Sequence, residues 1–221
     1  MTEKAFVYID GLNFYYGLVK NTSYKWLDFS KLMRKVLPTN FDILKIKYFT
    51  TIVKAFHNDP QAPQRQEFFL RALEKVNTNL EIFYGSFLVN LKWRYLESPI
   101  IDSTGQRISM ARVVEPEEKG SDVNLAIHLL NDSWLNLFDW AVVVSNDSDL
   151  AEALRLVKTQ CNKQILLIPT ISSIGSNIIK KPSSKLLNYA DKVIKIRESS
   201  LRNSQLPTNI PGTNIRKPNN W

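Results

Sequence analysis

Cysteine is almost absent from this sequence and glycine is scarce: the 221 residues include one cysteine and seven glycines. A single cysteine, Cys161, excludes an internal disulfide and a zinc site built from several cysteines. With so few glycines, no glycine-rich phosphate loop follows the first predicted strand. This argues against a nucleotide-cofactor site.

Long hydrophobic runs are also missing. No stretch approaches the roughly 20 apolar residues that a membrane-spanning helix requires, and the first residues lack the layout of a secretory signal. The 44% hydrophobic and 23% charged content is typical of a globular protein, and the length suits one domain with a complete core. We therefore expect a cytoplasmic protein with no membrane partner.

Acidic residues are outnumbered by basic ones. The chain has 29 Lys and Arg against 21 Asp and Glu, a formal net charge of +8, and its isoelectric point is about 9.5. This balance favours an anionic partner, with nucleic acid as the leading candidate, although a basic protein without such a partner would show it too. The interleaved basic and aromatic residues of Leu91–Pro99, "LKWRYLESP", suit a surface that binds phosphates and stacks bases, and equally a half-buried strand.

Strand-like and helix-like segments alternate along the chain. Near-continuous apolar strands that alternate with amphipathic helices predict an α/β fold, a three-layer α/β/α sandwich with a mainly parallel central sheet. The strands are predicted at 5–9, 43–53, 80–89, 140–145, 164–170 and 192–196, with helices at 29–37, 64–76, 122–132, 149–160 and 183–190.

Two segments depart from this alternation. The stretch 91–114 contains two alternating segments around a turn, which predicts a hairpin-like excursion. The segment 199–221 is rich in Ser, Asn and Pro and almost free of acids, which predicts a flexible basic tail. We therefore expect one domain over 1–198 followed by this tail, and a homo-oligomer stays open.

Four aspartates are expected near one edge of the sheet. Asp10 ends the first strand, Asp147 and Asp149 follow the strand at 140–145, and Asp122 opens the helix before that strand. Ligand sites of open parallel sheets form beyond the carboxyl ends of strands, where the strand order reverses. If the two strands are neighbours, three carboxylates converge, and Asp122 joins them if the preceding chain takes a suitable path.

Clustered carboxylates favour a bound cation, because they repel one another and are costly to desolvate. Mg²⁺ takes carboxylates, waters and phosphate oxygens as ligands, which suits phosphodiester hydrolysis. Each acid also has a simpler interpretation. Asp149 could cap a helix, Asp122 could favour a helix dipole, and Asp10 could be a turn residue; the joint placement is what favours a metal site.

Three motifs resemble those of the NYN domain family, a branch of the PIN-like metal-dependent ribonucleases of the DUF88 or LabA-like type. The resemblance covers about 5–196 and extends to "LLNYADKVIKI" near its end. The motifs are "YIDGLNFYYG" at 8–17, "EKGSDVNLAIHLL" at 118–130 and "VVSNDSDLAEAL" at 143–154.

The resemblance implies a PIN-like fold with a Mg²⁺ or Mn²⁺ site made by Asp10, Asp122, Asp147 and Asp149. These four acids and Asn13 are the candidate catalytic residues. The implied activity is that of a nuclease on RNA, with single-stranded DNA as a further substrate.

Five other positions bear on the substrate. The resemblance implies that Asn13 positions the substrate or a water at the metal, and that Lys119 and Ser145 contact the substrate, although Lys119 could be only an exposed loop residue. Asn146 stands where the family usually has glycine, and we expect asparagine to tolerate the positive φ of such a turn. His128 stands where many relatives carry an acid, and we expect a surface histidine there and not a ligand.

The leading hypothesis is a metal-dependent endoribonuclease that hydrolyses phosphodiester bonds in RNA. The alternative is a non-catalytic RNA-binding module with a PIN-like fold, which the net charge, Asn146 and the expected tail suggest. Two other metal sites fit less well. A Toprim-like site would have a glutamate in place of Asp10, and an aspartyl-phosphate phosphatase would have an acid in place of Leu12.

Overall fold

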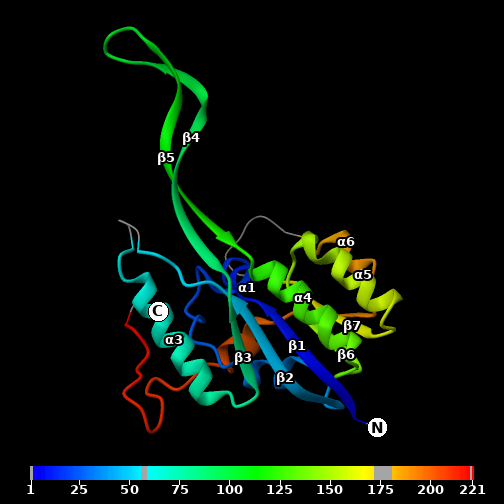
Figure 1. The fold of residues 1–221 in the computed structure, drawn as a ribbon. Helices are drawn as coiled ribbons and strands as arrows, with labels where there is room; N and C mark the ends of the chain where they lie inside the picture. The colour runs from blue at the N-terminus through cyan, green and yellow to red at the C-terminus, as the bar shows by residue number, and fades with distance from the viewer. Residues whose placement is uncertain (1, 56–58, 172–180, 220) are drawn as a thin grey trace.

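A six-stranded parallel sheet forms the centre of the molecule (Figure 1). The computed structural model describes residues 2–55, 59–171, 181–219 and 221. The strand order is β3-β2-β1-β6-β7-β8. The bounds are Glu3–Asp10 (β1), Phe41–Thr50 (β2), Leu80–Tyr84 (β3), Trp140–Val144 (β6), Gln164–Ile168 (β7) and Lys192–Val193 (β8).

Helices cover both faces of this sheet, which confirms the predicted three-layer α/β/α fold. One apolar cluster packs under α4, α5 and α6, and the other packs under α1, α2, α3 and the C-terminal segment. The bounds are Gly11–Phe14 (α1), Phe29–Val36 (α2), Ala62–Val76 (α3), Ser121–Trp134 (α4), Ala151–Thr159 (α5), Ser184–Leu187 (α6) and Glu198–Arg202 (α7), with a π-helical turn η1 at Tyr15–Val19 and a 3₁₀ turn η2 at Ser148–Leu150.

The central strands are buried along most of their length because both of their faces are covered. All five residues of β6 are buried, and so are the last six of β1. This is the burial expected of a parallel sheet between two helical layers. The continuous apolar runs in the sequence therefore reflect the position of β1 and β6 at the middle of the sheet.

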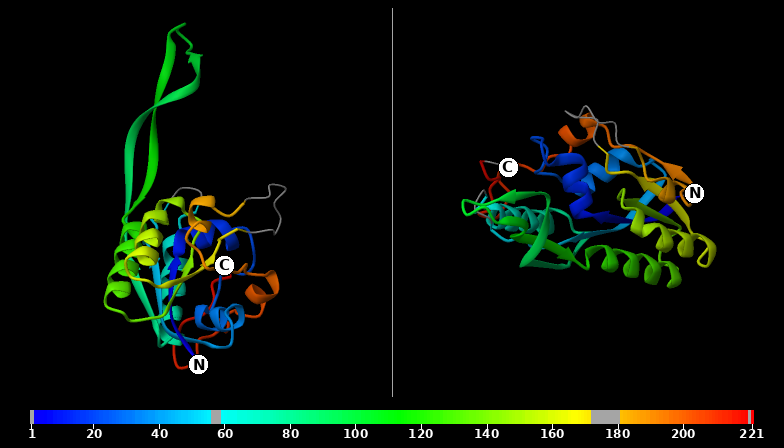
Figure 2. Two further views of the ribbon diagram at one scale, coloured as in Figure 1. Left: turned by 90° about the vertical axis from the view of Figure 1, so that its right-hand side faces the viewer. Right: turned by 90° about the horizontal axis from the view of Figure 1, so that it is seen from above.

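A long hairpin projects from the body (Figures 1 and 2). Its strands are β4 (Ser86–Ile101) and β5 (Arg107–Lys119), which pair antiparallel in a separate two-stranded sheet. The single strand predicted at 80–89 is therefore wrong, since it divides at Gly85. A Cβ at Gly85 would lie 2.8 Å from Glu118 Oε1 and 2.8 Å from Lys119 O, so the chain crosses the root of the hairpin where only glycine fits.

The C-terminal segment belongs to the folded domain, and the flexible tail predicted over 199–221 is wrong for its described residues. The indole nitrogen of Trp26 donates to Pro207 O at 2.9 Å, which fastens the segment to the layer that holds α2. Its apolar residues are separated by polar residues in the sequence, but each of several packs in the core. The buried ones are Leu201, Leu206, Ile210 and Ile215.

Within residues 2–55, 59–171, 181–219 and 221, no helix combines the length and apolar character needed to cross a membrane.

Candidate metal centre

The strand order reverses between β1 and β6, and the predicted acids lie at this point. β1 and β6 pair in parallel, with Ile9 opposite Val144. The residues that follow, Asp10 and Ser145, therefore leave the sheet side by side. The expectation that these two strands are neighbours is confirmed, and it brings Asp147 to the same edge.

Three aspartates converge at this edge. Asp10, Asp122 and Asp147 each offer a carboxylate oxygen, and these oxygens all lie within 4.8 Å of one another. Asp122 arrives from the first turn of α4, because Gly120 adopts a left-handed conformation (φ 90°) and turns the chain from β5 into the helix. The chain that precedes Asp122 therefore takes the path that brings it to the other acids, a point that the sequence did not decide.

Asp149 lies outside this group of three. It is exposed, and its backbone N–H donates to Asp147 Oδ1 at 3.0 Å. Asp147 is therefore the residue that caps the short turn η2, and the interpretation of Asp149 as the cap is wrong. The Asp149 charge is still close enough to help raise the pKa of Asp122.

Asp10 is buried and held by two hydrogen bonds. Its Oδ1 accepts from the backbone N–H of Asn13 at 2.9 Å, and its Oδ2 accepts from Ser145 Oγ at 2.8 Å. Burial raises the pKa of Asp10 to about 6, the two hydrogen bonds oppose this, and the charges of Asp147 and Glu118 add to it. The two hydrogen bonds therefore fix the orientation of this carboxylate, but they do not offset the effect of burial and of the neighbouring acids on its pKa.

The pKa of the Asp122 carboxyl is also raised. Burial, followed by the charges of Asp10, Asp147, Glu118 and Asp149, raises its pKa to about 7. Among the described residues, no lysine or arginine is a leading cause of either shift. A divalent cation would supply the missing positive charge.

Ser145 and Asn13 position the acids and the loop that carries Asp147. Ser145 is fully buried; its hydroxyl donates to Asp10 and accepts from the backbone N–H of Asp147 at 3.0 Å. Asn13 Oδ1 accepts from the backbone N–H of Asn146 at 3.0 Å and from the hydroxyl of Thr170. Their contacts to a substrate stay predictions.

Asn146 does not need the backbone freedom of glycine. Among the non-glycine residues that the structure describes, positive φ occurs at Asn136 and Asn162 and not at Asn146. The Asn146 side chain accepts from the backbone N–H of Ser183 at 2.8 Å. The expected positive φ is therefore wrong, and the side chain instead fastens the loop to the start of α6.

Glu118, which the sequence motifs did not single out, lies near the three aspartates, whereas Lys119 is paired with Glu117. Glu118 lies near enough to raise the pKa of both Asp10 and Asp122, and its Oε1 accepts from the backbone N–H of Ser121 at 2.9 Å. The exposed Lys119 has its Nζ 3.3 Å from Glu117 Oε1. The motif "EKGSD" contained this fourth nearby acid, but only its lysine and aspartate were assigned.

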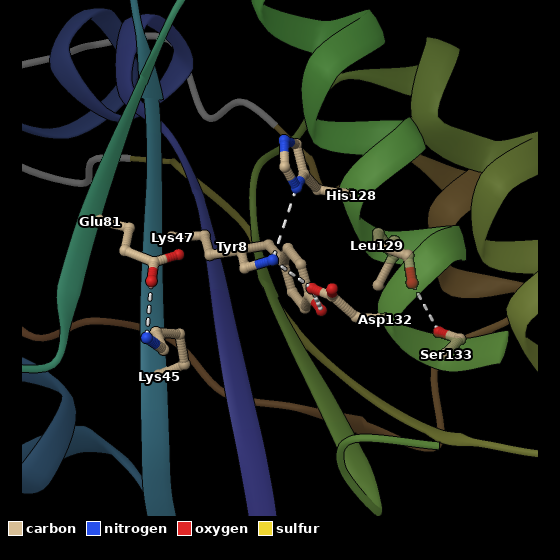
Figure 3. A network of polar contacts seen from close by, with 8 residues as sticks. All are labelled: Tyr8, Lys45, Lys47, Glu81, His128, Leu129, Asp132 and Ser133. Atoms are coloured by element: carbon tan, nitrogen blue, oxygen red, sulfur yellow. Dashed lines mark hydrogen bonds and ion pairs between the residues drawn. The ribbon is translucent and has the colours of Figure 1, made fainter. Parts of the chain in front are cut away.

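His128 lies apart from the acids, in a polar network on the inner side of α4 (Figure 3). Its Nδ1 is 3.4 Å from Lys47 Nζ, which forms a buried ion pair of 2.6 Å with Asp132. The hydroxyl of Tyr8 donates to the same Asp132 oxygen at 2.7 Å. Burial, followed by the Lys47 charge, lowers the pKa of His128, so this half-buried residue is neither a ligand of the centre nor a simple surface histidine.

Comparison with known proteins supplies the family. A scan against models of known protein families finds no match. The 6-hydroxy-3-succinoylpyridine 3-monooxygenase HspA of Pseudomonas putida (strain DSM 28022 / S16) is 32% identical over 236 residues, which cover 97% of this chain and 74% of HspA. This chain belongs to the HspA family. The HspA family thus includes a protein named as an enzyme, and the acids of this chain are compatible with a metal site.

A solved structure resembles this HspA-family chain in fold. It is that of a protein of unknown function, VPA0982 from Vibrio parahaemolyticus RIMD 2210633. The TM-score is 0.50 at 18% sequence identity, and the match covers 93% of this chain and 97% of the other. This likeness supports the α/β fold alone.

In this HspA-family chain, a cavity of about 830 Å³ lies on the side of the sheet that holds α1, α2 and α3. Gly11, which follows Asp10, and Glu118 both contribute to its wall. The rest of the wall is rich in aromatic rings and cations, and it also contains Asp59, which forms an ion pair with Arg65. The aromatic members are Phe14, Tyr15, Tyr16, Phe29, Tyr48, Phe69, Phe87 and Trp221, and the cationic ones are Lys20, Lys25, Lys54 and Arg65.

Proposed function

We propose that this chain is a divalent-metal-dependent hydrolase that cleaves phosphodiester bonds in RNA. The observation that carries the proposal is the convergence of Asp10, Asp122 and Asp147, whose ligand oxygens lie within 4.8 Å of one another. A donor set made only of carboxylate oxygens suits hard cations such as Mg²⁺ and Mn²⁺. The three motifs that resemble the NYN family supply these same acids.

The charge on the acids fits such a cation. The pKa values of Asp10 and Asp122, about 6 and about 7, are raised chiefly by burial and further by neighbouring acids, which a cation would offset. A bound Mg²⁺ or Mn²⁺ would activate a water and neutralise charge on the phosphate.

The residues around the cation would have different roles. Asn13 and Ser145 hold Asp10 in one orientation, and the turn η2 presents Asp147 beside it. Asp149, which is exposed at the rim, would act on water or substrate and not as a ligand within the group. The net charge of +8 would draw the polyanionic substrate towards the protein.

Cleavage of labelled nucleic acids tests this proposal. Single-stranded RNA, hairpin RNA and single-stranded DNA are incubated with Mg²⁺, Mn²⁺ or chelator, and the wild type is compared with Asp147→Asn. We expect metal-dependent cleavage of RNA that Asp147→Asn abolishes, whereas Asp42→Asn, an exposed aspartate at the start of β2, retains it. RNA binding without cleavage under any metal would instead support the non-catalytic RNA-binding module.

The family relation favours a second candidate, monooxygenation of a small aromatic substrate. HspA is named for its action on 6-hydroxy-3-succinoylpyridine, an aromatic ring with an anionic side chain. The aromatic and cationic lining of the cavity beside Gly11 and Glu118 suits that class of molecule. Such a reaction needs O₂ and a two-electron reductant, because one oxygen atom enters the ring and the other leaves as water. Incorporation of ¹⁸O from ¹⁸O₂ into a hydroxypyridine would support it.

A further inference from the structure

The projecting hairpin has one apolar face and one charged face. Residues that lie opposite each other in an antiparallel pair share a face, and successive residues alternate between faces. One set of pairs is almost entirely apolar, and the set between them is mostly polar. The apolar face consists of Val89–Pro116, Leu91–Val114, Trp93–Arg112 and Tyr95–Met110, and the charged face of Leu88–Glu117, Asn90–Glu115, Lys92–Val113 and Arg94–Ala111.

Ion pairs within the hairpin neutralise the charged face. Lys92 Nζ lies 2.9 Å from Glu117 Oε2, and the guanidinium of Arg94 donates twice to Glu115, each at 2.9 Å. The aromatic and basic residues of "LKWRYLESP" thus lie on opposite faces. The cations are already paired with acids on the charged face, so the aromatic rings and the basic groups of this stretch do not share one face.

The apolar face is exposed along its outer half. The exposed fractions are 57% for Leu91, 62% for Trp93, 81% for Tyr95 and 55% for Val114. Figures 1 and 2 show the hairpin extending away from the body, so no other described segment covers this part of it. A two-stranded hairpin is marginally stable in water unless a further layer covers its hydrophobic face.

The exposed area is close to what one side of a dimer requires. Large aromatic side chains bury roughly 150–250 Å², so Trp93 and Tyr95, exposed by 62% and 81%, offer about 250–300 Å² together. Leu91, Val114 and Ile100 bring this to about 500–600 Å²; Ile100 is 56% exposed and pairs with Ile108, which lies on the same face as Met110 two residues along β5. A stable interface buries roughly 800 Å² per partner, and the flanking side chains and backbone of the hairpin supply the remainder.

We propose that the apolar face packs against the apolar face of a second copy of this chain, related by a two-fold axis. A two-fold contact needs a patch that complements itself, and a face that is apolar except for one cation does so. The eight residues of this face include one cation, Arg112, and no acid. RNA would require several cations to meet its phosphates, whereas one Arg112 per copy can lie over an aromatic ring of the other copy.

Sedimentation of the full chain over a range of concentrations tests this inference. We expect a wild-type dimer, and a dimer dissociation constant that rises at least ~100-fold in Trp93→Ser/Tyr95→Ser, because two central aromatic anchors are removed. The matched control is Leu88→Ser/Val113→Ser on the charged face, where the side chains are 39% and 37% exposed. This control should dimerise as the wild type does.

Two results would overturn the inference. One is a wild type that stays monomeric at about 100 μM, well above the dissociation constants of specific complexes; loss of RNA binding by Trp93→Ser/Tyr95→Ser would then assign the face to RNA. The other is a dimer that both double variants preserve. All four positions are substantially exposed, so thermal unfolding that matches the wild type will separate lost association from lost folding. The measurement does not depend on the metal centre.

Discussion

Binding of a divalent cation to the acidic centre should depend steeply on pH. The pKa of Asp10 is raised to about 6 and that of Asp122 to about 7, in both cases chiefly by burial. A cation binds the ionised carboxylates, so protons compete with it below these values. The affinity should therefore increase with pH and level off above pH 8.

The two pKa values set the size of the effect. With one carboxyl of about 6 and one of about 7, both must lose a proton at pH 5 before the cation binds. The affinity at pH 5 should then be about 1000-fold below its plateau, and at pH 6 about 20-fold below it. Carboxyls with ordinary pKa values near 4 would lower the affinity less than twofold over the same range.

Calorimetric titration with Mn²⁺ between pH 5 and pH 8 measures this dependence. Asp122→Asn serves as the control, because it removes the group with the higher pKa. Its affinity should be lower at every pH but should vary only below about pH 7, following Asp10 alone. A wild-type affinity that stays constant from pH 5 to pH 8 would refute the reasoning.

Four further predictions concern charge and packing. Since both raised pKa values let the folded state bind more protons than the unfolded state, the free energy of unfolding of the metal-free protein should fall as the pH rises from about 4 to about 7, as urea titrations will measure. Ser145→Ala removes a hydrogen bond to Asp10, worth about 1–2 pKa units for that charged group, so Mn²⁺ affinity should fall about 2- to 10-fold at pH 7 and recover above about pH 9. Lys47→Met leaves Asp132 as a buried charge without its cation and should lower the free energy of unfolding by about 3–5 kcal/mol; the triple variant Lys47→Met/Asp132→Leu/Tyr8→Phe, which also removes the Tyr8 hydroxyl that donates to Asp132, should regain most of this loss. Leu206→Ala, at a buried position, should cost about 2–4 kcal/mol by urea denaturation, whereas a flexible tail would show no change.

The sheet and two of the three converging acids could be predicted because they depend on local patterns. A continuous apolar run indicates a strand covered on both faces, and the runs that end at Asp10 and Val144 are those strands. Parallel strands place the residues that follow them at one edge. Asp10 and Asp147 therefore meet for reasons visible in the sequence.

The remaining parts of the centre depend on the path of the chain between elements. Asp122 and Glu118 reach the acids because the hairpin returns to its root and Gly120 turns the chain into α4. Asp149 is only two residues from Asp147, but the turn η2 leaves it exposed. Neither effect is encoded in hydrophobic periodicity.

The C-terminal segment shows a different limit. Composition describes the average of a segment, and the average of 199–221 is polar. Packing is decided by single side chains, and Leu206 and Ile210 each fill a place in the core beside the helical layer. A few well-placed apolar residues outweigh a composition typical of disorder.

The two candidate functions lie at neighbouring places in the fold, so the choice of substrate separates them better than the choice of variant. Asp10 and Asp147 would hold the cation for hydrolysis, and the cavity with Gly11 and Glu118 in its wall would receive the aromatic substrate. Hydrolysis of RNA needs water alone as the second reactant and should proceed equally well without O₂. Monooxygenation consumes O₂ and a reductant. Cleavage of RNA under anaerobic conditions would therefore assign the acids to hydrolysis whatever the family relation suggests, and oxygen-dependent turnover of a hydroxypyridine would assign the neighbouring aromatic cavity to the chemistry for which HspA is named.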